Sequence, residues 1–385
     1  MKFVHIADMH FDSPFVNLSD KESLGDLRRL EQRKIFKKVI EYIKENNIEF
    51  LFIAGDLYEH KYVKKTTIEY INNLFKEIPN TKIFITPGNH DPFIKNSYYN
   101  KFNWNENVKI FNSKIEKIET EKADIYGYGF DDFYCTQSNI ENVEIENNNK
   151  INILVMHGTL DGASIEEKQY NSIKSKTLKE KGFDYIALGH IHKLDYNTYE
   201  NQRIVYPGST VSLGFDELGE HGMIVGEVDE EKINLKFVPL DEKEFIIQNI
   251  DVTEIASKEE LIEKLNELNF DENKLVEIYL IGKRNFEIDT FEIYKLILNN
   301  QIIKIKNKTK INYNLEIISN ENTLRGIFAK KMLEKLNNTE NTEEKEIIEK
   351  AIEVGLDSLK WWFWRLRKNH NSNYLAIEEK IIILR

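Results

Sequence analysis

Five short blocks of acid, amide and imidazole side chains constrain this chain most, because each block ends an apolar run. The runs read FVHIAD, FLFIAGD, KIFITPGNHD, INILVMHG and DYIALGHIH. Short β-branched and aromatic runs of this kind are typical of strands that are buried on both faces. In open α/β sheets the ligand site lies beyond the carboxyl ends of the strands. The sequence therefore predicts an α/β fold whose strand ends bring these polar side chains to one rim.

The polar side chains of the blocks are of the kinds that bind divalent metal ions. The proposed ligands are Asp8, His10, Asp56, Asn89, His157, His190 and His192. Mixed carboxylate, amide and imidazole ligands suit Mn²⁺, or alternatively Fe²⁺, better than they suit structural zinc. Two ions are expected, with Asp56 as the bridge because one carboxylate has two oxygens. The first ion would take Asp8, His10, Asp56 and His192, and the second would take Asp56, Asn89, His157 and His190.

His90 and Asp91 directly follow the proposed ligand Asn89 and are predicted to be catalytic. His90 should lie beside the metals without binding them, where it could protonate the leaving oxygen or stabilise charge in the transition state. Asp91 is expected to orient the His90 ring. A packed core histidine is the more ordinary interpretation of any one of these residues alone. Six of the nine histidines, however, fall in or beside the blocks, and only His5 is explained by packing.

Length and composition limit the alternatives. The chain has 385 residues, which predicts two or three domains, and its net charge of −12 gives no overall attraction to nucleic acid. Any polyanion would be held by local basic patches and by the metals. The only cysteine, Cys135, permits no internal disulfide and favours a cytoplasmic location. No apolar run is long enough to span a bilayer, so no membrane partner is expected.

Three regions follow from the order of strand and helix patterns. Residues 1–240 alternate the two patterns and are expected to form the α/β domain that carries the blocks. Residues 241–319 contain strand-like and helical pieces that predict a small α+β capping domain with a role in DNA binding. Residues 320–385 read mostly as helix and are expected to bind a partner.

The five blocks resemble the pattern of the calcineurin-like metallophosphoesterases, which runs DxH, GD, GNHD, H and GHxH. The resemblance implies a four-layer sandwich of two mixed β-sheets flanked by helices, and hydrolysis of phosphoesters. Over residues 189–222 the resemblance is to one group within this family, the SbcD-type DNA repair exonucleases. There, GHxH is followed by YPGS and then by Glu and Gly. The helical segment IIEKAIEVGLDSL is similar to the tail of the YhaO branch of that group.

One position departs from the pattern. Several of these nucleases place a histidine just after the GD block, where this chain reads Gly55-Asp56-Leu57-Tyr58-Glu59-His60. Either His60 or Glu59 would fill the second catalytic position, and with Glu59 the exonuclease step would be altered. Close by, Lys61, Lys64 and Lys65 are predicted to guide a phosphate chain into the site.

Two further features bear on partners. Lys304, Lys306, Lys308 and Lys310 alternate along an apparent strand, which indicates either a DNA contact or, slightly favoured, a solvated edge strand. Near the C-terminus, an apolar stripe runs from Ile348 through Trp362 to Leu366, and Trp361, Phe363 and Trp364 widen it. In SbcD-type proteins such a helix docks on a coiled-coil ATPase, although closure over its own domain is an equal alternative.

The sequence thus favours a Mn²⁺-dependent DNA exonuclease or endonuclease, one component of an SbcCD-like complex acting in DNA repair. The expected partners are DNA and an SbcC-like ATPase, with a homodimer as a further option. One alternative is a metallophosphoesterase acting on a cyclic nucleotide or a phosphoprotein. Another is a largely non-catalytic, metal-bound scaffold for an ATPase.

Overall fold

The computed structural model describes residues 1–15, 24–134, 140, 143–145, 150–161, 172–196, 203–229 and 232–369, with side chains described up to residue 359. The chain divides into two compact units. The first comprises Met1–Ile247, Phe270–Glu277 and Gln301–Lys304, and the second comprises Gln248–Asn269, Ile278–Asn300 and Ile305–Arg385. The expected three-domain division, with boundaries at residues 240 and 319, stays a prediction.

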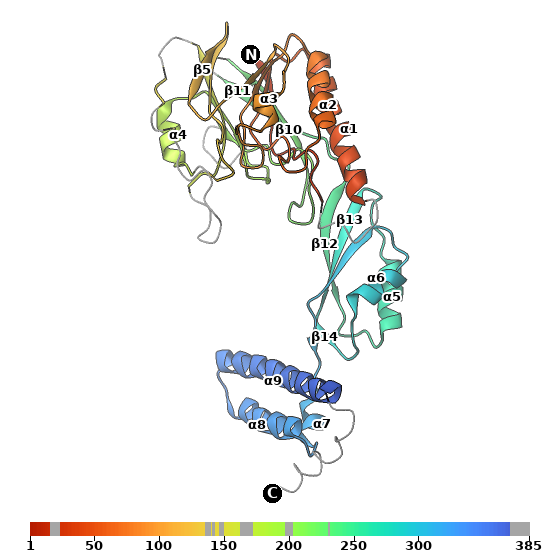
Figure 1. The fold of residues 1–385 in the computed structure, drawn as a ribbon. Helices are drawn as coiled ribbons and strands as arrows, with labels where there is room; N and C mark the ends of the chain where they lie inside the picture. The colour runs from red at the N-terminus through yellow and green to blue at the C-terminus, as the bar shows by residue number, and fades with distance from the viewer. Residues whose placement is uncertain are drawn as a thin grey trace. The chain divides into compact units, whose positions relative to one another are not determined.

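Two mixed sheets form the centre of the first unit (Figure 1). The six-stranded sheet has the order β11-β10-β1-β2-β3-β4. Its strands are β1 (Lys2–Ile6), β2 (Phe50–Ile53), β3 (Lys82–Ile85), β4 (Val108–Ile110), β10 (Gly222–Val228) and β11 (Ile233–Pro239). β1 to β4 run parallel, and β10 pairs antiparallel with both β1 and β11.

The five-stranded sheet has the order β5-β6-β7-β8-β9. Its strands are β5 (Glu116–Glu119), β6 (Ala123–Gly127), β7 (Ile151–His157), β8 (Tyr185–Gly189) and β9 (Ile204–Val205). Only β5 is antiparallel to its neighbour. In both sheets the strands that end on the polar blocks are parallel and adjacent, so their carboxyl ends meet at common edges.

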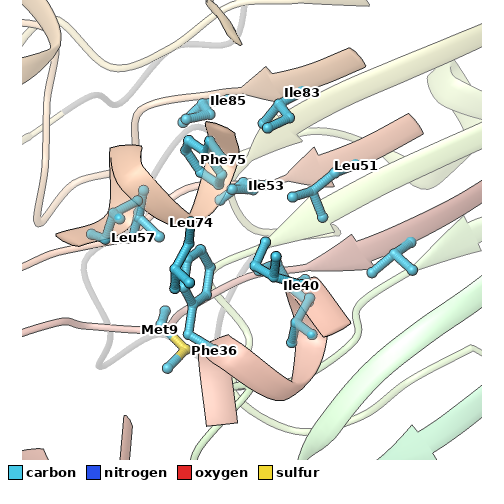
Figure 2. Packing of buried hydrophobic residues seen from close by; sticks show 14 of the residues in the cluster. Met9, Phe36, Ile40, Leu51, Ile53, Leu57, Leu74, Phe75, Ile83 and Ile85 are labelled. Atoms are coloured by element: carbon cyan, nitrogen blue, oxygen red, sulfur yellow. The ribbon is translucent and has the colours of Figure 1, made fainter. Parts of the chain in front are cut away.

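Helices cover the outer faces of the sheets. They are α1 (Leu24–Glu45), α2 (Lys65–Lys76), the short α3 (Tyr98–Lys101) and α4 (Ser175–Lys181). Figure 2 shows α1 and α2 packing Phe36, Ile40 and Phe75 against Leu51 and Ile53 of the six-stranded sheet. Each such fully buried side chain stabilises the fold by about 1.5–3 kcal/mol. On the other side, Leu178 of α4 packs against the five-stranded sheet.

A third apolar layer lies between the two sheets. Phe3, Phe52 and Phe84 of the first sheet meet Val155 and Tyr185 of the second. His5 belongs to this layer as well. It is fully buried, and its Nδ1 lies 2.8 Å from the Tyr185 hydroxyl oxygen. The order helices, sheet, sheet, helix is the four-layer sandwich that the resemblance implied, and His5 is a packing residue as expected.

Two small sheets and five helices make up the remaining described elements. A three-stranded sheet has the order β12-β13-β15, and a two-stranded one pairs β14 with β16. The strands are β12 (Glu244–Asp251), β13 (Lys274–Ile281), β14 (Lys283–Arg284), β15 (Ile302–Asn307) and β16 (Lys310–Ile311). The helices are α5 (Lys258–Glu267), α6 (Thr290–Leu296), α7 (Leu315–Ser319), α8 (Leu324–Asn338) and α9 (Thr342–Asn369). Ser257, Asp289 and Thr323 accept hydrogen bonds from first-turn amides and so cap α5, α6 and α8.

Helix α9 packs along α8 within the second unit. Its buried face consists of Ile348, Ile352 and Leu356, which contact Ile318 and Ala329. This part of the predicted stripe therefore closes over its own unit. The side chains of Trp361, Trp362, Phe363, Trp364 and Leu366 lie outside the described residues. Within the described part of the chain, no helix combines the length and the apolar character needed to cross a membrane.

The predicted lysine row does not form one strand. β15 ends at Asn307, whose side chain accepts hydrogen bonds from Thr309, and Lys310 belongs to β16. Lys308 places its ammonium 3.3 Å from the centre of the Tyr279 ring, whereas Lys310 pairs with Glu353 of α9 at 3.4 Å. Only Lys304 and Lys306 therefore lie on β15, and the prediction of four lysines on one strand face is wrong.

Candidate metal centre

The predicted ligands lie just beyond the carboxyl ends of parallel strands. Asp8 and His10 follow β1, Asp56 follows β2, and Asn89 follows β3. The other three come from the second sheet, where His157 ends β7 and His190 and His192 follow β8. Backbone hydrogen bonds join the loops, with Asp8 N donating to Gly55 O at 3.1 Å and His10 N donating to Asp56 O at 2.9 Å. The structure thus brings all seven predicted ligands to one rim.

A first group of ligand atoms forms around His10. The side chains of Asp8, His10 and His192 each offer one atom, and these atoms all lie within 4.8 Å of one another. His10 Nε2 lies 3.3 Å from His192 Nε2 and 3.7 Å from Asp56 Oδ2. Each imidazole also has a carboxylate at its Nδ1, with Glu59 at 2.8 Å from His10 and Glu217 at 2.5 Å from His192.

Those carboxylates decide which nitrogen can bind a metal. A carboxylate only accepts hydrogen bonds, so both rings donate from Nδ1, and in the neutral rings the lone pairs are on Nε2. The two Nε2 lone pairs then face each other beside buried Asp8 and Asp56. Such an arrangement is repulsive unless a cation or a proton lies between them, so the residues present fit a divalent ion.

A second group forms around the other side of Asp56. Asp8, Asp56 and His157 also lie within ligand distance of one another. His157 donates from Nδ1 to Ala54 O at 2.8 Å, and its Nε2 lies 3.4 Å from Asp56 Oδ2. Asn89 Oδ1 lies 3.1 Å from His157 Nε2 and 3.2 Å from His190 Nδ1. Asp56 contacts both groups, as a bridging ligand should.

The electrostatics of the site show what a cation would replace. Burial disfavours charge on Asp56, but three neighbouring imidazoles, led by His157, hold the pKa of this carboxyl well below its ordinary value. Burial likewise opposes charge on His157, and Asp56 more than offsets it, so the pKa of His157 rises to about 9. Burial and the nearby His157 lower the pKa of His190 to about 3. In the metal-free protein, protons on some of these imidazoles therefore balance the carboxylates.

His90 lies beside the ligands and is the most exposed side chain of the site. Its ring stands edge-on to His10 with 4.7 Å between ring centres, and the side chain is 44% exposed. Its Nδ1 lies 3.0 Å from Glu59 Oε2. Burial lowers the pKa of His90, but the hydrogen bond to Glu59 and the charge of Asp56 outweigh it and raise this pKa to about 9. Glu59 and Asp56 therefore favour the protonated form of the ring in the metal-free protein.

Asp91 does not contact the His90 ring, which corrects the role predicted for it. It is fully buried and accepts hydrogen bonds from the backbone amides of Asp56, Leu57 and Gly88 at 3.1, 2.7 and 2.7 Å. The Tyr99 hydroxyl adds a bond of 2.6 Å. Asp91 thus ties the loop after β2 to the loop after β3, and it holds the backbone of Asp56 rather than an imidazole.

His60, Lys61 and Lys64 lie in the turn that leads into α2, and Lys65 is the first residue of that helix. The His60 amide donates to His90 O at 3.0 Å, and its ring packs edge-on to Phe133 with 5.6 Å between ring centres. Lys61, Lys64 and Lys65 are exposed, and Lys65 pairs with Glu69. Their role in guiding a phosphate chain stays a prediction. Glu59, and not His60, occupies the position between the ligand His10 and His90.

The sequence interpretation missed Glu217. Its carboxylate is only 10% exposed and accepts from His192 Nδ1, from Ser209 Oγ at 2.6 Å and from Leu213 N at 3.1 Å. It fixes the ring of a ligand that lies 25 residues earlier in the sequence. The only signal was the Glu that follows YPGS in the family-like stretch, and nothing in its spacing indicated a contact with His192.

Several site residues have unusual backbones. The φ angles of Asp8, His10, Asp56 and His190 are 51°, 46°, 51° and 99°, a region that residues other than glycine rarely adopt. Asp and His are among those that tolerate it best. Gly88 serves a different purpose, because a Cβ there would lie 2.2 Å from Asp56 Oδ1. The residue types in the blocks are therefore limited in three ways: by metal binding, by the close contact between neighbouring loops and by the strained backbone.

The chain is similar to known proteins. A model of the calcineurin-like phosphoesterase family matches residues 1–194. Over 276 residues the chain is 25% identical to the uncharacterized metallophosphoesterase YhaO of Bacillus subtilis (strain 168), an overlap of 69% of this chain and 67% of that protein. Over 311 residues it is 28% identical to a protein of Staphylococcus saprophyticus that is named as a subunit of nuclease SbcCD, an overlap of 71% and 77%.

Among solved structures, TT1561 of Thermus thermophilus aligns with 61% of this chain and 98% of its own, at 11% identity and a TM-score of 0.36. That likeness is too weak to carry a functional conclusion. The family model, by contrast, covers half of the sequence and all but the last elements of the two sheets that hold the ligands. The chain belongs to the calcineurin-like phosphoesterase family.

Proposed function

We propose that this protein is a dinuclear-metal phosphodiesterase that cleaves DNA, and that Mn²⁺ is its metal, with Fe²⁺ as the alternative. The observation that carries the proposal is the convergence of the seven predicted ligand side chains from two sheets on one rim, with His90 beside them. DNA as the substrate is supported by the similarity to a protein named as a subunit of the nuclease SbcCD. The complete ligand set argues against a purely structural role.

The residues divide into two sets that share Asp56. Asp8, His10, Asp56 and His192 would hold one ion, and Asp56, Asn89, His157 and His190 would hold the other. When bound, two divalent ions supply positive charge at the phosphoryl oxygens and lower the pKa of a bound water. Each set contains two imidazole nitrogen ligands, whereas Mg²⁺ prefers oxygen ligands and its own waters. This composition favours Mn²⁺ over Mg²⁺.

His90 is suited to the departure of the leaving group. Hydrolysis breaks one phosphorus–oxygen bond, and the alkoxide that leaves needs a proton. When protonated, the exposed His90 ring can donate that proton from Nε2, because its Nδ1 is held by Glu59. Asp91 keeps the loops after β2 and β3 together, so that Asp56 and His90 retain their spacing. Exposed Lys61, Lys64 and Lys65 are proposed to contact the flanking phosphates.

A partner ATPase forms part of the proposal. The similar protein is named as one subunit of the nuclease SbcCD, which supports a complex with an SbcC-like coiled-coil ATPase in DNA repair. The region 320–385 is the proposed contact, because α9 continues beyond the face that packs on α8. A homodimer and a cytoplasmic location remain predictions from the sequence.

The test uses the full chain stripped of metal and reloaded with Mn²⁺ or Mg²⁺. The substrates are end-labelled duplex DNA, hairpin DNA, bis-p-nitrophenyl phosphate, a cyclic nucleotide and a phosphopeptide. We expect Mn²⁺-dependent cleavage of DNA and of the small diester, with little activity in Mg²⁺. Hydrolysis of the cyclic nucleotide or phosphopeptide without cleavage of DNA would contradict DNA as the substrate and would favour the hydrolysed compound instead. Metal binding without hydrolysis of any substrate would favour the scaffold.

A further inference from the structure

Helix α1 carries a polar side chain at a position where its neighbours are apolar. Gln32 is fully buried, and Ile35, Phe36 and Val39 are buried on the same face of the helix. Burying an amide costs free energy unless its polar atoms are hydrogen-bonded. Among the described residues Gln32 Oε1 accepts no hydrogen bond, whereas Nε2 donates two. Packing alone therefore does not explain a glutamine at this position.

Both hydrogen bonds of Gln32 go to the backbone of the loop after β1. Nε2 lies 2.9 Å from Met9 O and 3.0 Å from His10 O. An amide NH₂ group has one hydrogen for each of these carbonyls, whereas an amide oxygen in its place would repel both. The two carbonyls belong to the peptide groups on either side of the His10 Cα. A side chain that holds both peptide groups therefore restrains the φ and ψ angles of His10.

His10 has a backbone that needs such a restraint. Its φ angle is 46°, in the left-handed region that is costly for a residue with a side chain. The φ and ψ angles also set the direction of the Cα–Cβ bond, and so the direction in which the imidazole leaves the loop. In this conformation His10 Nε2 lies 3.3 Å from His192 Nε2 and 3.7 Å from Asp56 Oδ2. An ordinary backbone conformation would move the ring away from these ligand atoms.

Neighbouring side chains of α1 hold the rest of the same loop. Arg29 Nη1 donates to Ser13 O at 3.1 Å, and Arg33 Nη2 donates to Asp12 Oδ1 at 2.8 Å. Positions 29, 32 and 33 lie on one face of the helix, because residues three and four apart are neighbours on its surface. Gln32 is the fully buried member of this row, and it contacts the backbone of a predicted metal ligand.

We propose that Gln32 is a positioning residue, which fixes the left-handed backbone of His10 and so holds this ligand in place before the first ion binds. The inference rests on the metal centre and the function proposed above and deepens them. Gln32 lies outside the five blocks, 22 positions after His10. Its loss should weaken the ion held by the set that contains His10 and spare the ion held by the other set.

Gln32→Met tests the requirement for the two donors. Methionine keeps the length of the side chain and suits a buried position, but it has no hydrogen to donate. The matched control is Asn72→Leu, which removes another buried side-chain amide. Asn72 lies on α2, and its Oδ1 accepts from Asn105 N at 3.0 Å, outside the loops that carry the ligands. Asn72→Leu should lower the unfolding temperature of the metal-free protein without changing its affinity for Mn²⁺.

The first measurement needs no substrate. Calorimetric titration of the metal-free protein with Mn²⁺ alone should show about 10–100-fold weaker binding of one ion in Gln32→Met, the usual effect of losing a residue that supports a ligand. At a Mn²⁺ concentration that fills both sites of the wild type, the electron paramagnetic resonance spectrum of this variant should show isolated ions in place of a coupled pair. Wild-type affinity for both ions, or equal weakening of both, would overturn the proposal. This titration stands even if the wild type hydrolyses no diester, in which case only the proposed function fails.

The second measurement is the Mn²⁺ dependence of hydrolysis of bis-p-nitrophenyl phosphate. The Mn²⁺ concentration for half-maximal rate should rise by the same factor of about 10–100 in Gln32→Met. The rate at saturating Mn²⁺ should stay close to that of the wild type, because the bound ion then holds the His10 ring. A large loss of the saturated rate with an unchanged Mn²⁺ requirement would contradict a positioning role. Should Gln32→Met not fold, Gln32→Asn provides the same comparisons, since its amide is one methylene too short to reach both carbonyls.

Discussion

The rim of the first unit and the helical pair α8–α9 of the second unit differ in how their residues are held. At the rim, the predicted ligands end or follow buried strands, and three of the imidazoles have a partner at Nδ1: Glu59 for His10, Ala54 O for His157 and Glu217 for His192. On α9, one face is buried through Ile348, Ile352 and Leu356, while Ile347 and Val354 are 69% and 58% exposed. A site that needs side chains in a fixed geometry can be recognised in the sequence as a motif. A surface that only needs to stay exposed has a much weaker sequence pattern.

Asp56→Ala should give the largest effect, because it removes the residue common to both ligand sets. We expect loss of both ions and a fall in diester hydrolysis of at least about 10⁴-fold, since the ions contribute several kcal/mol to transition-state stabilisation. Elemental analysis of the purified protein beside a hydrolysis assay checks this. Asp26→Ala is the control, because Asp26 is 76% exposed on α1. An Asp56→Ala protein that keeps both metals would refute the bridge.

His90→Ala should separate chemistry from metal binding at the same rim. We expect an almost unchanged metal content and a fall in DNA turnover of about 10²–10⁴-fold, the range for loss of a general acid. Elemental analysis and single-turnover cleavage provide the two readouts. If this variant loses as much metal as Asp56→Ala, His90 is a ligand and its assigned role is wrong.

Glu217→Gln should have a smaller effect and act on metal affinity. Its carboxylate holds His192 by Nδ1, and loss of such a contact typically weakens metal binding about 10–100-fold. Competition with a chelator measures the affinity for each ion. Glu220→Gln is a matched control, since Glu220 lies three residues later on the same loop and is exposed. Equal effects of the two substitutions would mean that only the charge of the loop matters.

Metal affinity should rise with pH. The pKa of His157 and of His192 is raised to about 9 in the metal-free protein, in each case because nearby carboxylates outweigh burial. A metal ion needs the neutral rings, so below pH 9 it must displace protons. Between pH 6 and 8 each displaced proton should strengthen apparent binding by up to about tenfold per pH unit. Calorimetry in buffers of different ionisation enthalpy counts those protons, and a count of zero would contradict the charge balance at the rim.

Leu356→Ala should affect hydrolysis least. The side chain is fully buried between α8 and α9, so its loss should destabilise the helical pair by about 2–5 kcal/mol. Metal content and hydrolysis of bis-p-nitrophenyl phosphate should not change. Thermal unfolding followed with and without Mn²⁺ tests this, with Val354→Ala on the exposed face as the control. A loss of metal from Leu356→Ala would show that the rim depends on α9.

The sequence predicted much of the first unit because five of its strands are short apolar runs. Each of these runs leads, at its carboxyl end, into a block with a predicted ligand. The runs before Asp8, Asp56 and His157 are strands β1, β2 and β7 in the structure, and the seven predicted ligands lie together. The partners of those ligands were not predictable in the same way. Glu59 reaches His10 across 49 positions and Glu217 reaches His192 across 25, through loops that have no periodic pattern.

Asp91 shows a related limit. Its place beside His90 in the sequence suggested a contact between their side chains, yet adjacent residues in a turn can point in different directions. Asp91 points inward to four backbone amides, whereas His90 points toward Glu59 and solvent. The hydrogen-bond partners of a side chain in a loop depend on the path of the backbone, and a sequence motif does not give that path.

The left-handed backbone at Asp8, His10 and Asp56 has a consequence for how this protein could change over evolutionary time. Each of these conformations costs about 1–3 kcal/mol in a residue with a side chain, and glycine or asparagine relieves part of that cost. A descendant freed from selection for hydrolysis would gain stability by accepting glycine or asparagine at these positions. Decay of the activity should therefore be traceable in sequences as such replacements, and they would precede any visible erosion of the sandwich core.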